Sequence, residues 1–507
     1  MTGTGLLTGL AGFLCVLLAI PLIIQRIAPA LTGRRDRQIH QTHKVPVPRL
    51  GGLALAAAFV LVVPIALLFA ASEGKSPRLG LTTSFTALLM FGLGFWDDLR
   101  PLGARKKLLG QIVIALLAFL CGLQVESFKN PISGVIYDLG LWGLPATVLW
   151  LVTLTNLINL IDGIDGLAGG ISLMLMCLLV YVGFQANQFT YPYLVAFGMA
   201  GALIAFLNFN FPPAKIYLGD GGAYFLGYLI GALAIQNSNK GTVAAALIAP
   251  IFALALPILD VTLSILRRGL HGLPIFRPDR RHIHHRLIQS GFSRRRAVLT
   301  LYGISLVFLG LAFVAFWSRG KWTPLLFGCV FLVLIVIVPS LGLLRNWLAI
   351  GSALGTSLEI RKQVQYTLLL RNWLEMEAER ADSVESLWSD LVFMARKIGF
   401  TAMTLRAGDA QRAWESATSV SDARQHFVQH ELQIDGKSVH LEFRARRSDM
   451  SEKLFGVVTE LVAEGWLNAS LRWRECREIP FALPVRNENT SAVKREPVPS
   501  VPHSLPV

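Results

Sequence analysis

The sequence predicts an all-α polytopic membrane protein with about eleven transmembrane helices, followed by a small C-terminal α/β domain. Three observations support this fold class. The 507-residue chain is 53% hydrophobic and only 16% charged, and its mean hydropathy of +0.53 is too high for a soluble chain of this length. Apolar runs close to the roughly 20 residues that cross a bilayer recur through the first two thirds of the chain. After about residue 343 the composition becomes mixed.

The apolar runs define the candidate transmembrane helices. They cover about residues 4–25, 50–70, 82–96, 108–124, 144–160, 169–186, 192–208, 223–236, 243–266, 298–317 and 323–343. The first run has no basic segment before it and no small-residue cleavage site, so we expect a retained helix rather than a signal peptide. The five cysteines have no paired spacing and therefore suggest neither a disulfide framework nor a zinc site.

Basic residues alternate between the connections of these helices. Most of them follow odd-numbered spans, and the other connections hold only Lys75, Arg78, Lys129, Lys240, Arg319 and Lys321. The positive-inside rule then predicts that the N-terminus lies outside and that the odd-numbered connections and the C-terminal region are cytoplasmic. The net charge of +15 is explained by this topology and by anionic headgroups, and it requires no nucleic acid.

The C-terminal region divides into a domain and a tail. A charged helical stretch precedes two alternating segments, TAMTLRA and KSVHLEFRARR, and an apolar-periodic helix follows them. We expect a membrane domain over 1–343 and a cytoplasmic α/β domain over 344–477. The order of elements in the latter resembles that of small GAF-like sensor folds, and a regulatory or partner-binding role is the corresponding hypothesis. The proline-rich residues 478–507 are predicted to be disordered.

Five polar motifs fall at predicted span ends on the same side of the membrane. They are HKVPVPRLGG (43–52), GFWDDLRPLGARKK (94–107), NLINLIDGIDGLAGG (156–170), NFNFPPAKIYLGDGGAYFLG (208–227) and RPDRRHIHHRL (277–287). The predicted topology puts all five at the cytoplasmic face. This convergence indicates a single site at the membrane surface more strongly than any one motif does.

The motifs bring five carboxylates to the membrane edge. These are Asp97, Asp98, Asp162, Asp165 and Asp220. Acids beside apolar helix ends are costly unless they are paired or bound to a cation. Oxygen ligands suit Mg²⁺, with Mn²⁺ as an alternative, particularly where phosphates complete the coordination shell. Complementary positive or hydrogen-bonding groups come from Lys44, Lys107, Arg280, Arg281, His282, His284 and His285. Together these residues predict a site for a magnesium-bound pyrophosphate.

Simpler interpretations exist for each motif alone. The Asp97–Asp98 pair is compatible with a solvated helix cap, and the histidine run with an ordinary polar loop. Asp162 and Asp165 share a helix face with Asn159 at a spacing of three, which favours function. A secondary transporter is the competing class, although its polar residues would gather near the bilayer midplane on repeated helices. A catalytically silent membrane scaffold is a third alternative.

The chain resembles the polyprenyl-phosphate N-acetylhexosamine-1-phosphate transferases, integral membrane enzymes that start bacterial cell-envelope glycan synthesis. The resemblance covers about residues 1–343 and rests on the five motifs in the same order. The HIHH sequence resembles the corresponding motif of the branch that uses UDP-GlcNAc. The resemblance implies transfer of N-acetylhexosamine-1-phosphate from a UDP-sugar to polyprenyl phosphate, with release of UMP. It also implies a bacterial inner-membrane location. A homodimer and a cytoplasmic partner of the C-terminal domain are left open.

The resemblance assigns roles to individual residues. The expected metal ligands are Asp220 and Asp165. The expected catalytic residues are Asp97, Asp98, Asp165, His284 and His285, with one of the Asp97–Asp98 pair often proposed as a base. The expected substrate-binding residues are Lys44, Lys107, Asn159, Asp162, Arg281 and His282. Because a phosphate nucleophile is already anionic near neutral pH, the acid pair is also compatible with holding metal or orienting the lipid.

Overall fold

The computed structural model describes most of the chain in continuous segments. These are residues 2–29, 47–72, 76–129, 135–185, 190–238, 291–318, 350–407, 410–416, 425–434 and 437–477, with isolated residues between 254 and 332. The chain forms two compact units that divide near residue 354. They are called the membrane unit and the C-terminal unit below, and each is described by itself.

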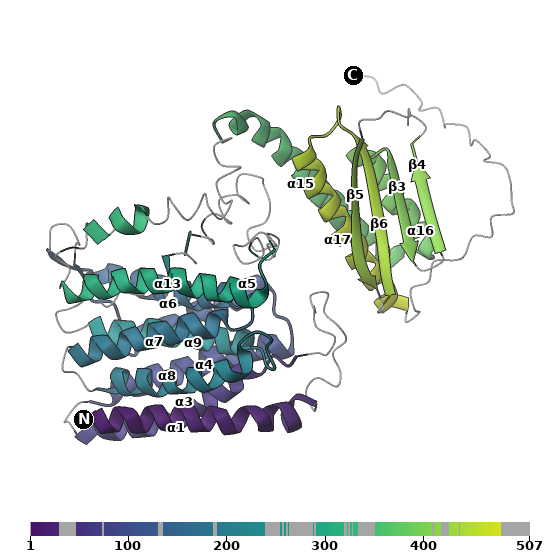
Figure 1. The fold of residues 1–507 in the computed structure, drawn as a ribbon. Helices are drawn as coiled ribbons and strands as arrows, with labels where there is room; N and C mark the ends of the chain where they lie inside the picture. Colours follow the sequence, from purple (N-terminus) through teal and green to yellow (C-terminus); the bar gives the residue numbers. More distant parts are fainter. Residues whose placement is uncertain are drawn as a thin grey trace. The chain divides into compact units, whose positions relative to one another are not determined.

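The membrane unit is built from long apolar helices (Figure 1). Their bounds are α1 (Thr2–Leu22, continued by η1, Ile23–Ile27), α3 (Gly51–Ser72), α4 (Arg78–Leu99), α5 (Ala104–Leu120), α6 (Gly143–Ile161), α7 (Leu167–Gln185), α8 (Tyr191–Asn210), α9 (Gly219–Ser238) and α13 (Arg294–Trp317). A short hairpin, β1 (Ser127–Lys129) with β2 (Ile136–Asp138), and the turn η2 (Gly140–Trp142) precede α6.

Seven helical segments in the described part of the chain are long and apolar enough to cross a membrane. They correspond to α1 with η1, α3, α4, η2 with α6, α7, α8 and α13. The protein is therefore a polytopic membrane protein, as the sequence predicts. Two predicted spans, 243–266 and 323–343, lie largely outside the described residues, so the total of eleven and the orientation in the membrane stay predictions.

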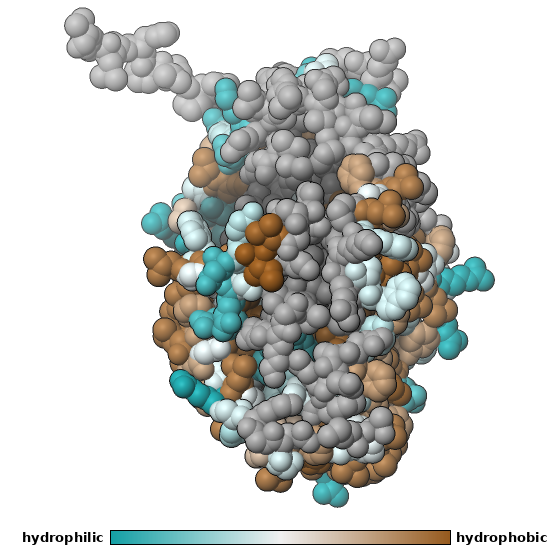
Figure 2. Space-filling view, turned by 90° about the vertical axis from the view of Figure 1, so that its left-hand side faces the viewer, coloured by the Kyte–Doolittle hydropathy of each residue, from teal (hydrophilic) through white to brown (hydrophobic). Residues whose placement is uncertain are grey.

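The outer surface of the membrane unit is suited to lipid. Large apolar side chains such as Leu18, Leu68 and Leu149 are about 70% exposed, at 67%, 73% and 69% respectively. Figure 2 shows apolar side chains over much of the coloured surface in its view. Because hydrocarbon solvates such side chains as well as a protein core does, this exposure indicates a bilayer around the helices.

Helix α9 is enclosed by its neighbours. Residues 221–235 are all buried, and α9 packs against α3, α4, α6 and α7 (Figure 1). Glycines allow this close approach, because a Cβ at Gly94 of α4 would fall 2.5 Å from the carbonyl oxygen of Asp220. Small residues at helix contacts permit such packing within membranes. The start of α9 is therefore held against the end of α4.

The C-terminal unit is an α/β structure with an antiparallel sheet. Its elements are α15 (Ile350–Arg380), α16 (Val384–Ile398), β3 (Ala402–Ala407), β4 (Ala410–Glu415), β5 (Gln425–Ile434), β6 (Lys437–Arg446) and α17 (Glu452–Arg477). The strand order is β4-β3-β6-β5, and Leu405 of β3 lies opposite Leu441 of β6. Both leucines are buried in a core with α15, α16 and α17, whereas Arg406 and Arg444 point away from that core.

The two strands predicted from the alternating segments are the central ones. TAMTLRA forms β3 and KSVHLEFRARR forms β6, and these pair with each other. The edge strands β4 and β5 were not predicted, because edge strands carry more polar residues and less regular apolar alternation. The tail 478–507 lies outside the described residues, so its predicted disorder stays a prediction.

A methyl group at Gly94 should disrupt the contact between α4 and α9. We expect Gly94→Ala to lower the free energy of unfolding by about 1–3 kcal/mol, because it inserts a Cβ into backbone that has no room to move. Gly92→Ala on the same helix is the matched control, since a Cβ there meets nothing within 4 Å. Thermal unfolding of both purified variants measures the difference, and equal stabilities would contradict this packing.

Candidate active site

Lys107 connects two of the predicted acids. Its ammonium, in the first turn of α5, forms an ion pair with the Asp97 carboxylate and lies 3.2 Å from Oδ2 of Asp220. Asp97, in the last turn of α4, also accepts a hydrogen bond of 2.6 Å from the Leu102 backbone N–H. The short connection from α4 to α5 folds this carboxylate and this ammonium together. The ends of α4, α5 and α9 thus meet at one cluster of charge.

Asp98 holds the N-terminus of α9. Its Oδ1 accepts a hydrogen bond of 3.0 Å from the Asp220 N–H, and its Oδ2 accepts one of 2.8 Å from the Gly221 N–H. The first N–H groups of a helix have no partner within the helix, and they carry partial positive charge that a carboxylate stabilises. Gly219 precedes them at φ +77°, where a side chain would also meet the Asp98 carboxylate.

The segment before α3 runs beside the segment before α9. The Tyr217 N–H donates to the Pro48 carbonyl at 2.9 Å, and the Gly51 and Gly52 N–H groups donate to the carbonyls of Tyr217 and Leu218 at 2.8 and 2.9 Å. These three bonds join the first and fourth sequence motifs. Arg49 lies within the bonded stretch, and its positive charge acts on both Asp98 and Asp162.

The DGIDG turn between α6 and α7 is fastened to the end of α8. Asp165 is buried, and its Oδ2 accepts a hydrogen bond of 3.1 Å from the Ala214 N–H. Asn210 accepts from the Gly166 N–H at 2.9 Å and donates to the Ile216 carbonyl at 2.8 Å. Helix α13 adds Arg294, whose Nη1 lies 4.0 Å from Oδ2 of Asp165. The third and fourth motifs therefore form one packed corner.

Asp162 and Asn159 lie at the end of α6, and both are half-buried. Burial raises the pKa of Asp162 well above its usual range, and the negative charges of Asp220 and Asp98 act in the same direction. The carboxylates of the second, third and fourth motifs are thus close enough to repel one another. Positive charge brought to this place would favour the ionised form of Asp162.

The amide side chains of Gln111 and Asn156 pair one helical turn along α5 from Lys107. Asn156 of α6 donates to Oε1 of Gln111 at 2.6 Å and to the Val152 carbonyl at 2.8 Å. Gln111 follows Lys107 by four residues on α5, so both side chains lie on the same helix face. These hydrogen bonds give a structural role to Asn156, the first polar residue of the NLINLIDGIDG motif. It links α6 to α5 below the charged cluster.

The structure describes the positions of some predicted site residues but not of others. Asp97, Asp98, Lys107 and Asp220 are in direct contact, and Asp162 and Asp165 belong to the adjoining turn. Six predicted residues lie outside the described residues. They are Lys44, Arg280, Arg281, His282, His284 and His285. The functional roles of all these residues stay predictions.

Three residues of the site were missed in the sequence. Arg49 is part of PRLGG and Asn210 is part of NFNF, so both were quoted within motifs without a role of their own. Arg294 begins the run of three arginines that opens α13, and it was not proposed as a site residue. A polar residue at the predicted edge of an apolar run was the available signal in each case.

The donor set of this cluster suits a hard divalent cation. Within the described residues no group of three or more His, Cys, Asp or Glu side chains is gathered closely enough to hold a metal by itself. Mg²⁺, however, commonly takes one or two protein carboxylates and completes its shell with water and substrate phosphates. The carboxylates of Asp97 and Asp220 share a single ammonium, so two acids already converge on one positive charge. The residues present fit such an ion.

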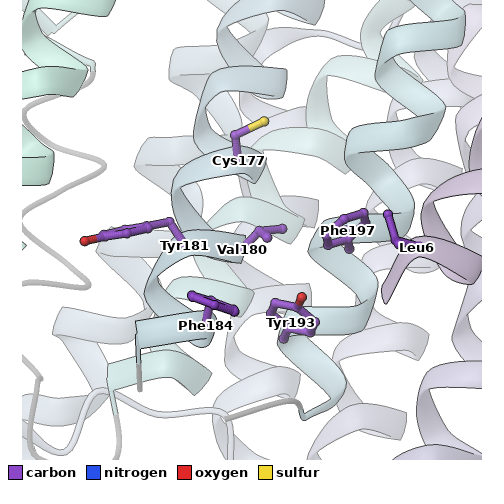
Figure 3. A pocket seen from close by; sticks show the side chains of 7 residues that line it. All are labelled: Leu6, Cys177, Val180, Tyr181, Phe184, Tyr193 and Phe197. Carbon is purple, nitrogen blue, oxygen red and sulfur yellow. The ribbon is translucent and has the colours of Figure 1, made fainter. Parts of the chain in front are cut away.

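A separate groove on the membrane unit lacks such chemistry. It has a volume of about 420 Å³ and is lined by Leu6, Cys177, Val180, Tyr181, Phe184, Tyr193 and Phe197 (Figure 3). The side chains come from α1, α7 and α8, and none is an Asp, Glu, Lys, Arg or His. Tyr193 is seventeen residues from Asn210 on α8, which is roughly 25 Å at 1.5 Å per residue. The groove is thus remote from the charged cluster.

The fold and the charged cluster define a class of protein, a polytopic membrane protein with a cluster of acidic and basic side chains at the ends of its helices. Comparison with known families identifies it further. Residues 81–238 match the model of glycosyl transferase family 4, a segment that contains the second, third and fourth motifs.

Alignments of the chain with several relatives cover most of each relative's length. The chain is 33% identical over 329 residues to "Probable undecaprenyl-phosphate N-acetylglucosaminyl 1-phosphate transferase" of Bacillus subtilis, covering 65% of this chain and 88% of the relative. It is 31% identical over 344 residues to the decaprenyl-phosphate N-acetylglucosaminephosphotransferase of Mycolicibacterium smegmatis, covering 62% and 82%. A phospho-N-acetylmuramoyl-pentapeptide-transferase of Listeria welshimeri is 30% identical, covering 58% and 93%.

The chain belongs to glycosyl transferase family 4. The resemblance to polyprenyl-phosphate N-acetylhexosamine-1-phosphate transferases that the motifs indicated is thereby confirmed. The alignments cover at most 65% of the chain, and the family model ends at residue 238.

Removing the Asn210 amide should loosen the corner that carries Asp165. We expect Asn210→Ala to lower the free energy of unfolding by about 2–4 kcal/mol, because the Gly166 N–H and the Ile216 carbonyl lose their buried partner. Asn208→Ala is the control, since Asn208 is exposed on the same helix. Thermal unfolding in detergent measures both variants. A loss no larger than that of the control would show that this amide does not fasten the turn.

Proposed function

We propose that the protein transfers N-acetylhexosamine-1-phosphate, specifically GlcNAc-1-phosphate, from UDP-GlcNAc to polyprenyl phosphate. The products are UMP and polyprenyl-diphospho-GlcNAc, the first lipid-linked intermediate of a cell-envelope polysaccharide. The observation that carries the proposal is the meeting of Asp97, Lys107 and Asp220 at the ends of α4, α5 and α9. The names of the relatives support the polyprenyl phosphate acceptor and the GlcNAc donor.

The reaction exchanges one phosphoanhydride for another. An oxygen of the carrier phosphate attacks the β-phosphorus of UDP-GlcNAc, and the bond from that phosphorus to the bridging oxygen breaks. UMP leaves with the bridging oxygen and its electron pair. The nucleophile is already anionic, so no proton must be removed from it. Catalysis then depends on positioning two polyanions and on neutralising their charge.

Positive side chains of the described residues would neutralise that charge. Lys107 stands between Asp97 and Asp220 and would meet the carrier phosphate, as its position in the α5 motif suggests. The charge of Arg49 acts on Asp162, and Arg294 lies 4.0 Å from Asp165, so both arginines would attract the diphosphate of the donor. Guanidinium groups bind phosphate oxygens through paired hydrogen bonds, which gives geometry as well as charge.

Asp98 serves as a positioning residue in this proposal. Both of its carboxylate oxygens accept N–H groups at the start of α9, so it fixes the backbone of Asp220 rather than meeting substrate. Asp97 is held by Lys107 and by the Leu102 N–H. The hypothesis that either acts as a base is not needed for a nucleophile that is already ionised.

Mg²⁺ is the proposed cofactor, with Mn²⁺ as an alternative. Asp220 would hold it, assisted by Asp97, which shares the Lys107 ammonium with Asp220, or by Asp162, on which the charge of Asp220 acts. The sequence also suggested Asp165 as a metal ligand. Its carboxylate accepts a hydrogen bond from the Ala214 N–H and lies beside Arg294, so in this proposal it would hold the turn in place and help to position the donor. When bound, the ion would neutralise diphosphate oxygens and polarise the β-phosphorus.

A bacterial inner-membrane location with the site facing the cytoplasm is also proposed. The uneven distribution of basic residues between connections supports this orientation. UDP-sugars are charged and water-soluble, so a donor site at the membrane surface on the side that makes nucleotides is chemically consistent. The lipid carrier would bring its phosphate to the same level from within the bilayer.

The reaction itself can be tested with purified protein. We expect incubation with Mg²⁺, polyprenyl phosphate and a panel of UDP-sugars to release UMP and form lipid-linked sugar in equal amounts, most rapidly from UDP-GlcNAc. The transporter alternative is tested with the same protein in vesicles. Movement of protons or ions, without lipid-linked sugar from any donor, would replace the proposed function with that alternative.

Asp220 should be essential for transfer without being essential for folding. We expect Asp220→Asn to lower transfer by at least about 1,000-fold, because it removes the carboxylate proposed to hold the Mg²⁺ that would neutralise the diphosphate. The Asp98 hydrogen bonds go to backbone N–H groups and persist in this variant. Asp138→Asn is the control, since Asp138 lies on the exposed strand β2. Substantial Mg²⁺-dependent UMP release by Asp220→Asn would contradict the assignment.

Lys107 and Lys106 form a matched pair for testing the shared ammonium. We expect Lys107→Ala to lower kcat/KM for transfer by roughly 100-fold, the usual effect of removing one preorganised charged donor. Lys106 is exposed on the neighbouring face of α5, so Lys106→Ala should stay within about two-fold of the parent chain. Equal effects of the two substitutions would argue against a specific role for Lys107.

A further inference from the structure

Helix α13 meets the DGIDG turn at two places. The first is the Asp165 carboxylate, where Nη1 of Arg294 lies 4.0 Å from Oδ2. The second is the backbone, because the Tyr302 hydroxyl donates a hydrogen bond of 2.5 Å to the Gly166 carbonyl. Side chains of a helix tilt toward its N-terminus, so Tyr302 reaches back toward the end at which Arg294 stands. Helix α13 packs against α7 (Figure 1) and lies beyond residues 81–238, which match the family model.

Gly166 is the most pliable joint of this turn. It directly follows Asp165 and has a φ of +81°, a conformation that residues with a side chain rarely adopt. Glycine also has more conformational freedom than any other residue. Rotation about Gly166 would change the direction of the Asp165 carboxylate relative to α7. The geometry of the site therefore depends on what restrains this glycine.

Hydrogen bonds restrain the peptide groups on both sides of Gly166. Its N–H, in the peptide group shared with Asp165, donates to Asn210 of α8 at 2.9 Å. Its carbonyl, in the next peptide group, accepts from the Gly170 N–H at 2.9 Å and from the Tyr302 hydroxyl. Because a peptide group is planar, a bond to either end restrains the whole plane. Helices α8 and α13 thus hold the glycine from opposite sides along the chain.

The packing makes room for the hydroxyl end of Tyr302 in particular. A Cβ at Gly170 would lie 2.0 Å from Oη of Tyr302 and 2.1 Å from its Cζ, far inside van der Waals contact. The neighbouring Val298 and Leu301 of α13 are buried, so the helix is firmly seated here. A phenylalanine would fill nearly the same space, which leaves the hydroxyl as the distinctive feature of Tyr302.

A simpler interpretation is that a half-buried phenol satisfies its own hydroxyl. The acceptor argues for more than this. The Gly166 carbonyl already accepts the first helical hydrogen bond of α7, from Gly170, so it needs no second donor. The bond from Tyr302 adds a restraint that comes from another helix, 136 residues further along the chain.

We propose that Tyr302 is a positioning residue for the donor side of the site. Its hydroxyl holds the Gly166 peptide group and thereby keeps the Asp165 carboxylate where it and Arg294 position the diphosphate of the UDP-sugar. This inference rests on the proposed function. Tyr302 acts through the turn and is assigned no contact with substrate.

Loss of the hydroxyl should weaken donor binding selectively. When a binding segment is correctly arranged only part of the time, the apparent Kd rises by the inverse of that fraction. One hydrogen bond of ordinary net strength corresponds to a change of about five-fold. The Lys107 cluster, assigned to the carrier phosphate, is held by α4, α5 and α9 and should be unaffected. A general loss of folded protein would instead lower kcat and leave both KM values unchanged.

Tyr302→Phe and Thr300→Val form the matched pair for the kinetic test. Each removes one hydroxyl from α13, but the Thr300 hydroxyl donates to the Arg296 carbonyl of its own helix at 2.9 Å. With the full-length chain, Mg²⁺ and polyprenyl phosphate, we expect Tyr302→Phe to raise the KM for UDP-GlcNAc about five-fold. The KM for polyprenyl phosphate should stay within about two-fold, and Thr300→Val should keep all constants within about two-fold.

Amide hydrogen exchange tests the restraint without substrates. In the purified full-length chain, we expect peptides covering residues 162–170 to exchange about five-fold faster in Tyr302→Phe than in the parent chain, because the turn opens more often. Exchange of the same peptides in Thr300→Val should match the parent chain.

Three results would overturn the inference while the proposed function stands. They are equal exchange over 162–170 in Tyr302→Phe and Thr300→Val, faster exchange without a rise in the KM for UDP-GlcNAc, and a fall in kcat with both KM values unchanged. Failure of the proposed function has a different signature, namely no UMP release by the parent chain from any UDP-sugar. The donor role of Tyr302 then falls with it, whatever the exchange shows.

Discussion

The attachment of the Asp98 carboxylate to the first N–H groups of α9 is the interaction on which the site depends. Asp220 is the second residue of α9, so its position follows from where that helix begins. Two hydrogen bonds of 3.0 and 2.8 Å hold this start against the end of α4. Gly94 and Gly219 have no side chain that would push these segments apart, so close packing also keeps the start of α9 beside the end of α4. An acid at the membrane edge is thereby used to build the site.

The remaining charges are arranged around that fixed point. Lys107 reaches Asp97 and Asp220 from α5, and Asp165 ties the DGIDG turn to the segment before α9. Acids outnumber bases among the described residues of this cluster. Burial, together with the negative charges of Asp220 and Asp98, raises the pKa of Asp162. An excess of carboxylates at the end of apolar helices is costly by itself. A cation with a polyphosphate ligand would relieve it, which is the physical basis of the proposed phosphosugar transfer.

Apolar runs predicted the membrane helices well, because burial in lipid requires about 20 apolar residues and leaves a strong signal. The partners of Asp98 were not predictable, since they are backbone N–H groups more than 120 residues away. Asn210 and Arg294 were missed for a related reason: their contacts join segments that are remote in sequence. In the C-terminal unit the central strands β3 and β6 were found, whereas the polar edge strands β4 and β5 were not.

The most direct measurement of the central claim follows the β-phosphorus of the donor. UDP-GlcNAc labelled at that atom is incubated with the purified protein, Mg²⁺ and polyprenyl phosphate, and the lipid and nucleotide products are separated. The account predicts that all transferred label enters the lipid as a diphosphate and that the released nucleotide is unlabelled UMP. Label retained in released UDP, with unlabelled sugar on the lipid, would contradict it.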